Sequence, residues 1–332
     1  MDKKNSLQIL GMNIELTTVC PLRCPQCYCS LEGGKHIPLE KAVNYLKQAK
    51  RLGLQHVELS GGETLCYPHL YELIREANSL GIESNIAISG CNFDSETFEK
   101  LRDAGLSKIF VSLNAPTERL NSESRDGYHY AIAALELLKE SDFSEVYINW
   151  VMHRNAVGAL PEMIELAQKY NVKAIVILAP KPTSQYELNT MPTLEQMEFV
   201  ARLIKTTPSG LLRVESCFSP LLAMASESKL LGNLNVGIFK GCGAGIRLLS
   251  VSVDGLLSPC RHLEYYEEWD SLEDYWTKSP ILQKLRTLEE NKIEPCASCR
   301  LKQYCRPCLA SSSKLDNKLC IGNRQCPLAG KI

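Results

Sequence analysis

The chain has 332 residues, of which 37 are Lys or Arg and 38 are Asp or Glu, so its formal net charge is −1 at pH 7. Balanced charge argues against a protein that binds nucleic-acid phosphates. No stretch reaches the roughly 18 uncharged apolar residues of a membrane-spanning helix. The first apolar run is broken by Gln8, Asn13 and Glu15, unlike a secretory signal. We therefore expect a cytoplasmic protein that binds neither nucleic acid nor membrane.

Cysteine is the unusual residue, because the chain has 15, an odd number. Disulfide scaffolds are typical of short secreted chains with paired cysteines, whereas this chain is long. Four cysteines lie between residues 20 and 29, and eight lie between residues 242 and 326. We expect reduced thiols, many of which bind metal. The uneven distribution predicts a larger domain over residues 1–230 and a smaller, cysteine-rich domain over residues 231–332.

In the first region, short β-branched runs alternate with amphipathic stretches. The runs predict strands buried on both faces, over Ile14–Thr17, His56–Ser60, Ser84–Ser89, Lys108–Leu113, Val146–Val151 and Lys173–Leu178. The amphipathic stretches predict helices over Leu39–Leu52, Pro68–Leu80, Ser95–Ala104, Tyr128–Ser141, Leu160–Tyr170 and Leu194–Lys205. This alternation indicates a parallel sheet. The expected fold class is α/β, with a partial (β/α)6 TIM-like barrel followed by the small cysteine-rich domain.

Polar residues follow the predicted strands at their carboxyl ends. They are Ser60, Ser89, Ser112, Asn114 and Asn149. Any one of them could be an ordinary strand end. In α/β barrels, however, this edge carries the active site, so together they predict a polar rim around it.

Three cysteines follow the first predicted strand in a C-x3-C-x2-C pattern: Cys20, Cys24 and Cys27. Three closely spaced thiolates can bind three irons of a 4Fe–4S cluster and leave its fourth iron open. Zinc is the alternative, but a structural zinc site needs four ligands. The pattern therefore favours the cluster.

The tripeptide Gly61-Gly62-Glu63 follows the second predicted strand. The glycines let a ligand approach the backbone closely, and the carboxylate can bind an ammonium group. Alone, such a tripeptide is usually an ordinary turn. After the cysteine motif, it indicates a site for a ligand with an amino group.

With these two motifs and the strand–helix alternation, the chain resembles the radical S-adenosylmethionine (SAM) enzymes over roughly residues 13–206. The resemblance implies that Cys20, Cys24 and Cys27 bind a 4Fe–4S cluster whose open iron chelates the amino and carboxylate groups of SAM. It also implies reductive cleavage of SAM to a 5′-deoxyadenosyl radical, which abstracts hydrogen from the substrate. The implied cofactor-binding residues are Gly61, Gly62, Glu63, Ser89, Ser112, Asn114 and Asn149. Gln26 departs from the family pattern, which usually has an aromatic residue before the third cysteine.

The second cysteine group has short spacers, which suit iron–sulfur clusters better than a zinc ribbon; a compact zinc site is the alternative. It reads Cys242-x12-Gly255-x4-Cys260, then Cys296-x2-Cys299-x5-Cys305-x2-Cys308, then Cys320 and Cys326. This array resembles the SPASM extension of radical SAM enzymes over roughly residues 241–328. It departs from that pattern in having two residues, rather than three, between Cys305 and Cys308.

The SPASM resemblance implies two auxiliary 4Fe–4S clusters, and so three clusters in all. The inner cluster takes Cys242, Cys260 and Cys308. The outer cluster takes Cys296, Cys299, Cys305 and a terminal cysteine, for which Cys326 is favoured over Cys320.

The resemblance leaves the fourth ligand of the inner cluster open. It could be Cys320, a residue other than cysteine, or none, in which case an open iron could bind substrate. Outside both groups are Cys29, Cys66, Cys91 and Cys217. We interpret Cys217 as a candidate hydrogen-atom donor to a substrate radical, against the alternative that it is a small buried apolar residue.

The family resemblance implies a radical SAM oxidoreductase or maturase that modifies a ribosomally made peptide or a protein side chain. Since only 13 residues precede the first predicted strand, we expect the barrel surface or a separate leader-binding protein to recognise the peptide. An external donor such as flavodoxin or ferredoxin would supply electrons. The alternatives are a small-molecule or cofactor-building radical dehydrogenase and, from another class, a multi-cluster electron carrier or iron–sulfur sensor.

Overall fold

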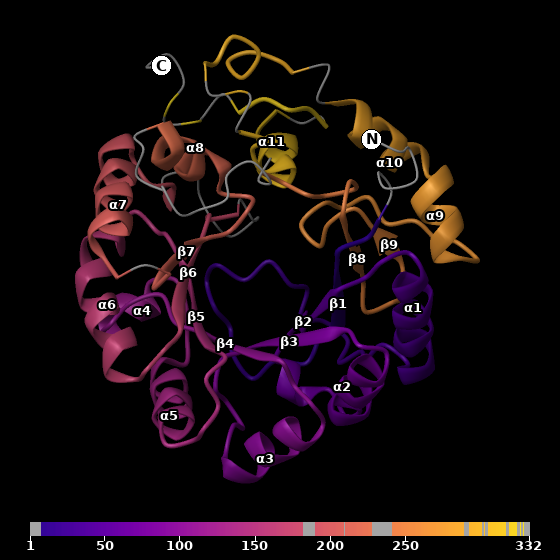
Figure 1. Ribbon diagram of the computed structural model, residues 1–332, viewed down its shortest axis with the longest axis horizontal. Coiled ribbons are helices and arrows are strands. Elements are labelled where there is room, and N and C mark those ends of the chain that lie inside the picture. The colour runs from indigo at the N-terminus through magenta and orange to yellow at the C-terminus, as the bar shows by residue number, and fades with distance from the viewer. Residues whose placement is uncertain are drawn as a thin grey trace.

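The protein is built on one curved sheet, which Figure 1 shows surrounded by helices. The computed structural model describes residues 8–181, 190–208, 210–227, 241–288, 292–300, 302, 305–316, 319–323, 326 and 328. In this part of the chain the sheet has nine strands, in the order β7-β6-β5-β4-β3-β2-β1-β8-β9. All neighbouring pairs are parallel except β8 with β9.

The six predicted strands are all present, as β1 to β6. The strands are β1 (Gly11–Thr17), β2 (His56–Gly61), β3 (Glu83–Ile88), β4 (Lys108–Ser112), β5 (Val146–Val151), β6 (Ala174–Leu178), β7 (Leu212–Val214), β8 (Leu248–Val251) and β9 (Leu257–Ser258). Strand β1 begins three residues earlier than predicted, because Asn13 interrupts the apolar pattern although it is buried in the sheet. The predicted α/β class and partial-barrel arrangement are confirmed.

Helices cover the convex face of the sheet, where Figure 1 places α1, α2, α3, α5, α6 and α7. The α-helices are α1 (Leu39–Arg51), α2 (Leu70–Ser79), α3 (Ser95–Asp103), α4 (Glu118–Ser122), α5 (Tyr128–Lys139), α6 (Leu160–Lys169), α7 (Leu194–Thr206), α8 (Ser219–Glu227), α9 (Leu272–Lys278), α10 (Pro280–Thr287) and α11 (Leu309–Asp316). The 3-10 helices are η2 (Thr64–Cys66) and η3 (Val157–Ala159). The six predicted helices agree with the observed ones within two residues at each end. No described helix is both long enough and apolar enough to cross a membrane.

The core lies between the sheet and these helices. Each helix presents one apolar side to the strands; α1, for example, buries Ala42, Tyr45, Leu46 and Ala49. Trp150 on β5 is one of two fully buried tryptophans among the described residues, and its Nε1 donates to the carbonyl oxygen of Asn114 at 2.8 Å. This bond fixes the chain at the carboxyl end of β4, where polar residues were predicted.

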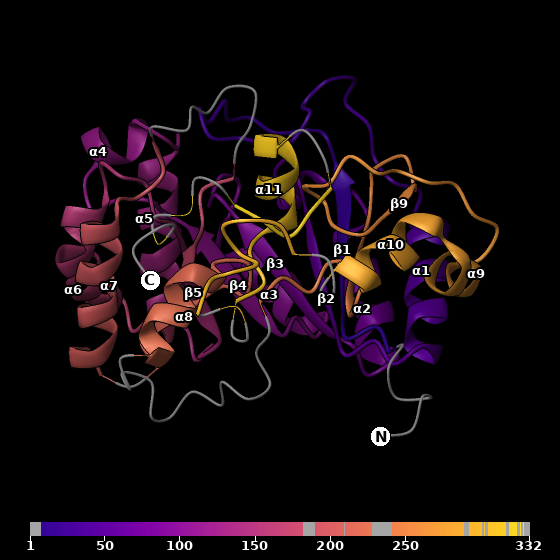
Figure 2. The same cartoon turned by 90° about the horizontal axis from the view of Figure 1, so that it is seen from above.

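The C-terminal part of the chain adds to the same sheet. Strand β8 pairs with β1, so the sheet continues past the domain boundary predicted at residues 230 and 231, and that boundary stays a prediction. Figures 1 and 2 show α9 beside α1, and α10 packs against α9. The hydroxyl of Tyr45 on α1 donates to the carbonyl oxygen of Gly255 at 2.8 Å, and Leu272 N donates to Gln48 Oε1 at 2.8 Å. The first strand of the barrel is therefore internal to the sheet.

Asn13 on β1 contacts the strands on both sides, and a substitution tests this junction. Its Nδ2 donates to Ser60 Oγ on β2 at 3.0 Å, and its Oδ1 accepts from Ser250 Oγ on β8 at 3.4 Å. We expect Asn13→Ala to lower the free energy of unfolding by about 1–3 kcal/mol, because two buried hydroxyls lose a partner. Urea denaturation of the metal-free protein measures it. Asn155→Ala, at an exposed position, is the control and should change stability by no more than about 0.5 kcal/mol. Equal effects of the two substitutions would contradict the assigned role.

Candidate active site

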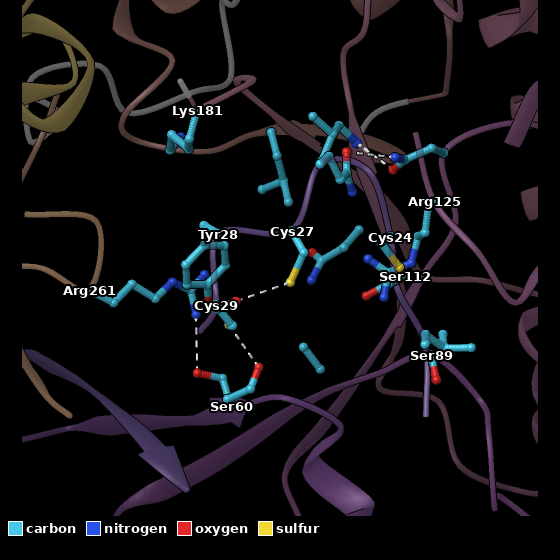
Figure 3. Close-up of a pocket in the computed structure, with 18 of the residues that line it drawn as sticks. Cys24, Cys27, Tyr28, Cys29, Ser60, Ser89, Ser112, Arg125, Lys181 and Arg261 are labelled. Atoms are coloured by element: carbon cyan, nitrogen blue, oxygen red, sulfur yellow. Dashed lines mark hydrogen bonds between the residues drawn. The ribbon is translucent and has the colours of Figure 1, made fainter. Parts of the chain in front are cut away.

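A pocket opens at the carboxyl ends of the barrel strands, and Figure 3 shows part of its lining. The structure brings the predicted residues of the first two motifs and the rim together here. The pocket is lined by Cys20, Cys24, Cys27, Ser60, Gly61, Gly62, Glu63, Ser89, Ser112, Asn114 and Asn149, among others. Residues far apart in the sequence therefore share one cavity, as expected for an active site on a barrel.

The thiols of Cys20, Cys24 and Cys27 lie on the loop that follows β1. Burial, followed by the charges on Glu63 and on the other two sulfurs, raises the pKa of the Cys20 thiol to about 11. The pKa of Cys27 is lowered to about 6, chiefly by a hydrogen bond from the thiol of Cys29. Three sulfurs close enough to influence one another, in one pocket, fit the donor set of a 4Fe–4S cluster.

The two glycines of the second motif lie where the end of β2 meets the chain after β1. Gly62 N donates to Thr17 O at 2.7 Å, and Glu63 N donates to Val19 O at 2.8 Å. A Cβ atom on Gly62 would lie 2.3 Å from Val19 O, and Gly61 has φ +131°. Neither position has room for an ordinary side chain. The glycines thus fix the start of the cysteine loop against the edge of the pocket.

Glu63 presents a buried carboxylate, since only 2% of the residue is exposed. Its Oε2 accepts hydrogen bonds from the backbone N of Ser89 at 2.9 Å and from the Ser89 hydroxyl, and Oε1 accepts from Leu65 N at 3.3 Å. Burial raises its pKa despite these bonds. A carboxylate in such surroundings is stabilised when a cation binds beside it.

Arg125 supplies positive charge on the same side of the pocket, next to Cys24 in Figure 3. Its charge lowers the pKa values of Cys24, Cys27 and Glu63. Within the described structure, its Nε is buried without a hydrogen-bond partner. An unsatisfied guanidinium donor near a buried carboxylate that forms no ion pair in the described part of the chain fits a ligand that carries both a carboxylate and an ammonium group. Arg125 was not identified from the sequence, because no motif marks it.

Asn114 has its amide hydrogens occupied by the protein. They are donated to Gln26 Oε1 at 2.9 Å and to Ser124 Oγ at 2.8 Å, while Oδ1 accepts from Val151 N at 3.1 Å. Gln26 Oε1 also contacts His153 Nε2 at 2.8 Å. Gln26, which departs from the family pattern, therefore connects the cysteine loop to Asn114 on the rim through a hydrogen bond. The predicted contact of Asn114 with the cofactor stays a prediction.

Ser112 and Asn149 are direct partners in the register of β4 and β5, so both side chains reach the pocket at the same level. Ser89 also lines the pocket, where it donates to Glu63. Their predicted role in cofactor binding stays a prediction.

The C-terminal region supplies a further wall of the pocket, which the sequence analysis missed. Arg261 forms an ion pair with Glu58 at 3.5 Å. It also donates to Ser60 Oγ at 3.3 Å and lies over the ring of Tyr28, as Figure 3 shows. Lys181 forms a largely buried ion pair with Glu215 on another side of the pocket. In the sequence, the position of Arg261 directly after the predicted ligand Cys260 could have indicated that Arg261 belongs to the site.

The C-terminal cysteines fall into two groups in space. In one group, the pKa of Cys305 is raised to about 12, chiefly by burial. The charges of Cys326, Cys296 and Cys299 contribute to this increase. The Cys320 Sγ lies 4.0 Å from Gly322 O. The preference for Cys326 over Cys320 in the outer group stays a prediction.

The other group consists of the predicted residues Cys242, Cys260 and Cys308. The charges of Cys242 and Cys308 both raise the pKa of Cys260. Interaction with Cys242 and Cys308, together with burial, raises the pKa of the Cys217 thiol well above its ordinary value. It is absent from the described residues that line the pocket. The ligand assignments of both groups stay predictions.

Comparison with known proteins agrees with this geometry. The sequence profile of the Radical SAM superfamily matches residues 14–167. A PqqA peptide cyclase from Methylobacterium nodulans is 30% identical over 87% of this chain and 78% of its own length. Another from Gluconobacter oxydans is 30% identical over 89% of this chain and 83% of its own length.

Two solved structures share the fold. SuiB from Streptococcus suis, bound to its precursor peptide SuiA, has a TM-score of 0.79, with 19% identity over 98% of this chain and 77% of that chain. The enzyme anSMEcpe with bound SAM and a peptide has a TM-score of 0.71, with 17% identity over 94% of this chain and 92% of that chain.

The fold and the site define a radical-generating iron–sulfur enzyme. The chain belongs to the radical SAM superfamily, and is an enzyme that uses SAM and the 4Fe–4S cluster of that family. The expected enzyme class is therefore confirmed.

Substituting Gly62 tests how the glycines position the cysteine loop. We expect Gly62→Ala to displace the loop, because the new Cβ would overlap Val19 O. After anaerobic reconstitution, the iron content should fall by about four per chain if the loop no longer binds its cluster. Gly158→Ala is the matched control, since a Cβ there meets nothing within 4 Å. Full iron content in Gly62→Ala would contradict this role.

Proposed function

We propose that this radical SAM enzyme modifies a ribosomally made peptide, with a protein side chain as the broader substrate class. The observation that carries the proposal is the similarity to PqqA peptide cyclases across 87% of the chain, at 30% identity. It favours a peptide over the small-molecule or cofactor-building alternative. The electron-carrier and sensor alternatives do not require a pocket with paired sites for an ammonium and a carboxylate.

The residues around the pocket fit the family's cofactors. Cys20, Cys24 and Cys27 would bind the cluster, Glu63 would bind the amino group of SAM, and Arg125 would bind its carboxylate. When bound, the cluster and SAM supply an organic radical that abstracts hydrogen from the substrate. Gly61 and Gly62 allow close approach to the backbone, and the neighbouring wall with Tyr28 and Arg261 limits the access of water.

We further propose two auxiliary 4Fe–4S clusters, an inner one at Cys242, Cys260 and Cys308 and an outer one at Cys296, Cys299, Cys305 and Cys326. The separation of these sulfurs into two groups supports this arrangement. We propose that a separate leader-binding protein presents the peptide and that flavodoxin or ferredoxin supplies electrons. The proposed location of the protein is the cytoplasm.

The reconstituted protein can be tested directly for peptide modification. It is incubated without oxygen, with SAM and dithionite, and with each peptide encoded by short reading frames beside its gene. We expect 5′-deoxyadenosine together with a mass change in one peptide, both detected by mass spectrometry. Cys24→Ala, which removes a cluster ligand, should produce neither. 5′-Deoxyadenosine formation without modification of any of these peptides would overturn the peptide proposal and leave the enzyme class intact.

Glu63→Gln separates cofactor binding from folding. The variant keeps an oxygen that can accept from Ser89 but loses the charge, so we expect the affinity for SAM to fall about tenfold or more. Equilibrium dialysis with the reconstituted protein measures this change. Glu162→Gln, at an exposed site on α6, is the control and should bind SAM like the parent. Unchanged affinity in Glu63→Gln would contradict the assigned role.

The same variant predicts a pH effect on stability. Burial raises the pKa of Glu63 in the folded state, so folding favours the neutral carboxyl. The parent's stability should therefore decline as pH rises through this folded-state pKa, and Glu63→Gln should lack that decline. Denaturation of the metal-free proteins at several pH values checks the difference.

A further inference from the structure

The cysteine loop that follows β1 is held at both of its ends. At its start, the backbone N atoms of Gly62 and Glu63 donate to carbonyl oxygens of the chain that leaves β1. At its other end lies Gln26, directly before Cys27, and the side chain of Gln26 contacts residues that follow β4 and β5. The first anchor belongs to the glycine motif, whereas no sequence motif marks the second.

Gln26 lies inside the turn that joins two of the proposed cluster ligands. Cys27 N donates to Cys24 O at 3.0 Å, so the four residues from Cys24 to Cys27 form a β-turn with Gln26 at its third position. Cys24, Gln26 and Cys27 all line the pocket. Any contact that fixes Gln26 therefore also fixes the spacing of these two sulfurs from the rim of the barrel.

Two side chains converge on one oxygen of Gln26. Asn114 Nδ2 lies 2.9 Å from Gln26 Oε1, and His153 Nε2 lies 2.8 Å from the same oxygen. The backbone N of Gln26 also donates to Ser124 O at 3.2 Å. Asn114, His153 and Ser124 are all buried. Three hydrogen bonds to buried partners therefore fix the end of the cysteine loop.

His153 acts as a donor in this contact, because an amide oxygen can only accept a hydrogen bond. Its Nε2 therefore carries a proton. Burial lowers the pKa of His153 to about 4, so the ring is neutral near pH 7. The backbone fixes the position of the ring, since His153 N donates to Val151 O at 2.8 Å and Ala156 N donates to His153 O at 2.9 Å. A neutral, well-fixed donor thus reaches from the end of β5 to the cysteine loop.

We propose that His153 is a positioning residue for the radical site: through its hydrogen bond to Gln26, it holds the Cys24–Cys27 turn in the position that SAM binding requires. Residues that hold a metal ligand in place contribute strongly to what the metal site binds. His153 is a better probe of this anchor than Asn114, which also bonds to Trp150 and Val151. The inference rests on the proposed function, because it takes Cys24 and Cys27 as cluster ligands.

Two substitutions separate the Nε2 bond from the rest of the side chain. Glutamine places an NH2 group near the position of Nε2, whereas asparagine places one near Nδ1 and leaves the position of Nε2 empty. Equilibrium dialysis of the reconstituted proteins measures SAM affinity, and EPR measures the change that SAM causes in the reduced cluster. We expect His153→Asn to bind SAM about three- to tenfold more weakly and to alter the EPR change. His153→Gln should retain most of the affinity.

Two further comparisons complete the test. His129→Asn makes the same exchange at an exposed position on α5 and should bind SAM like the parent. In a Gln26→Leu background the accepting oxygen is absent, so His153→Asn should cause no further loss of SAM affinity. If Gln26→Leu does not fold, the comparison between glutamine and asparagine at position 153 decides alone.

The outcomes distinguish this inference from the proposed function. Unchanged affinity in His153→Asn, equal losses in His153→Asn and His153→Gln, or an undiminished loss in the Gln26→Leu background would overturn the positioning role. The iron content and SAM binding of the parent would then leave the proposed function intact. A parent that binds neither iron nor SAM would overturn the proposed function, and this inference with it.

Discussion

The site depends on one close contact between backbones, where the end of β2 crosses the chain that leaves β1. Gly62 and Glu63 donate to the carbonyl oxygens of Thr17 and Val19, and a Cβ on Gly62 would lie 2.3 Å from one of them. These bonds hold the loop with the three cysteines next to the buried carboxylate of Glu63. Sulfur ligands and the proposed amino-group site are therefore positioned by the same few atoms, and neither can move without the other.

Around this contact, the protein gathers charge from distant segments. Arg125 lies between the end of β4 and α5, while Arg261 follows β9 near the other end of the sheet. The charge of Arg125 lowers the pKa values of Cys27 and Glu63. Arg261 forms an ion pair with Glu58 and lies over the ring of Tyr28. The C-terminal region thus lines part of the pocket, and it also contains the second group of cysteines. Lys181, between the pocket and the inner sulfurs, makes the two sites electrostatic neighbours.

The sequence predicted the barrel well because periodicity is a local property. The six predicted strands and six predicted helices of the first region are all present, although α4 and α8 were not predicted, and the motif and rim residues line one pocket. Strands β7, β8 and β9 were missed, since two to four residues are too few to show a pattern. Arg125 and Lys181 were missed as site residues for another reason. Their importance comes from long-range contacts with residues such as Glu63 and Glu215, which no spacing in the sequence encodes.

The pairing of β8 with β1 has a consequence for synthesis. Strand β1 emerges from the ribosome first, but its partner on one side is made more than two hundred residues later. Until then, β1 is an edge strand with unpaired backbone groups, which is a site for wrong association between chains. Contacts of such large sequence separation also form slowly. The nascent chain therefore carries an open edge beside its unmetallated cysteine loop until β8 has been made, and this interval is when it most needs protection by chaperones and from oxidants.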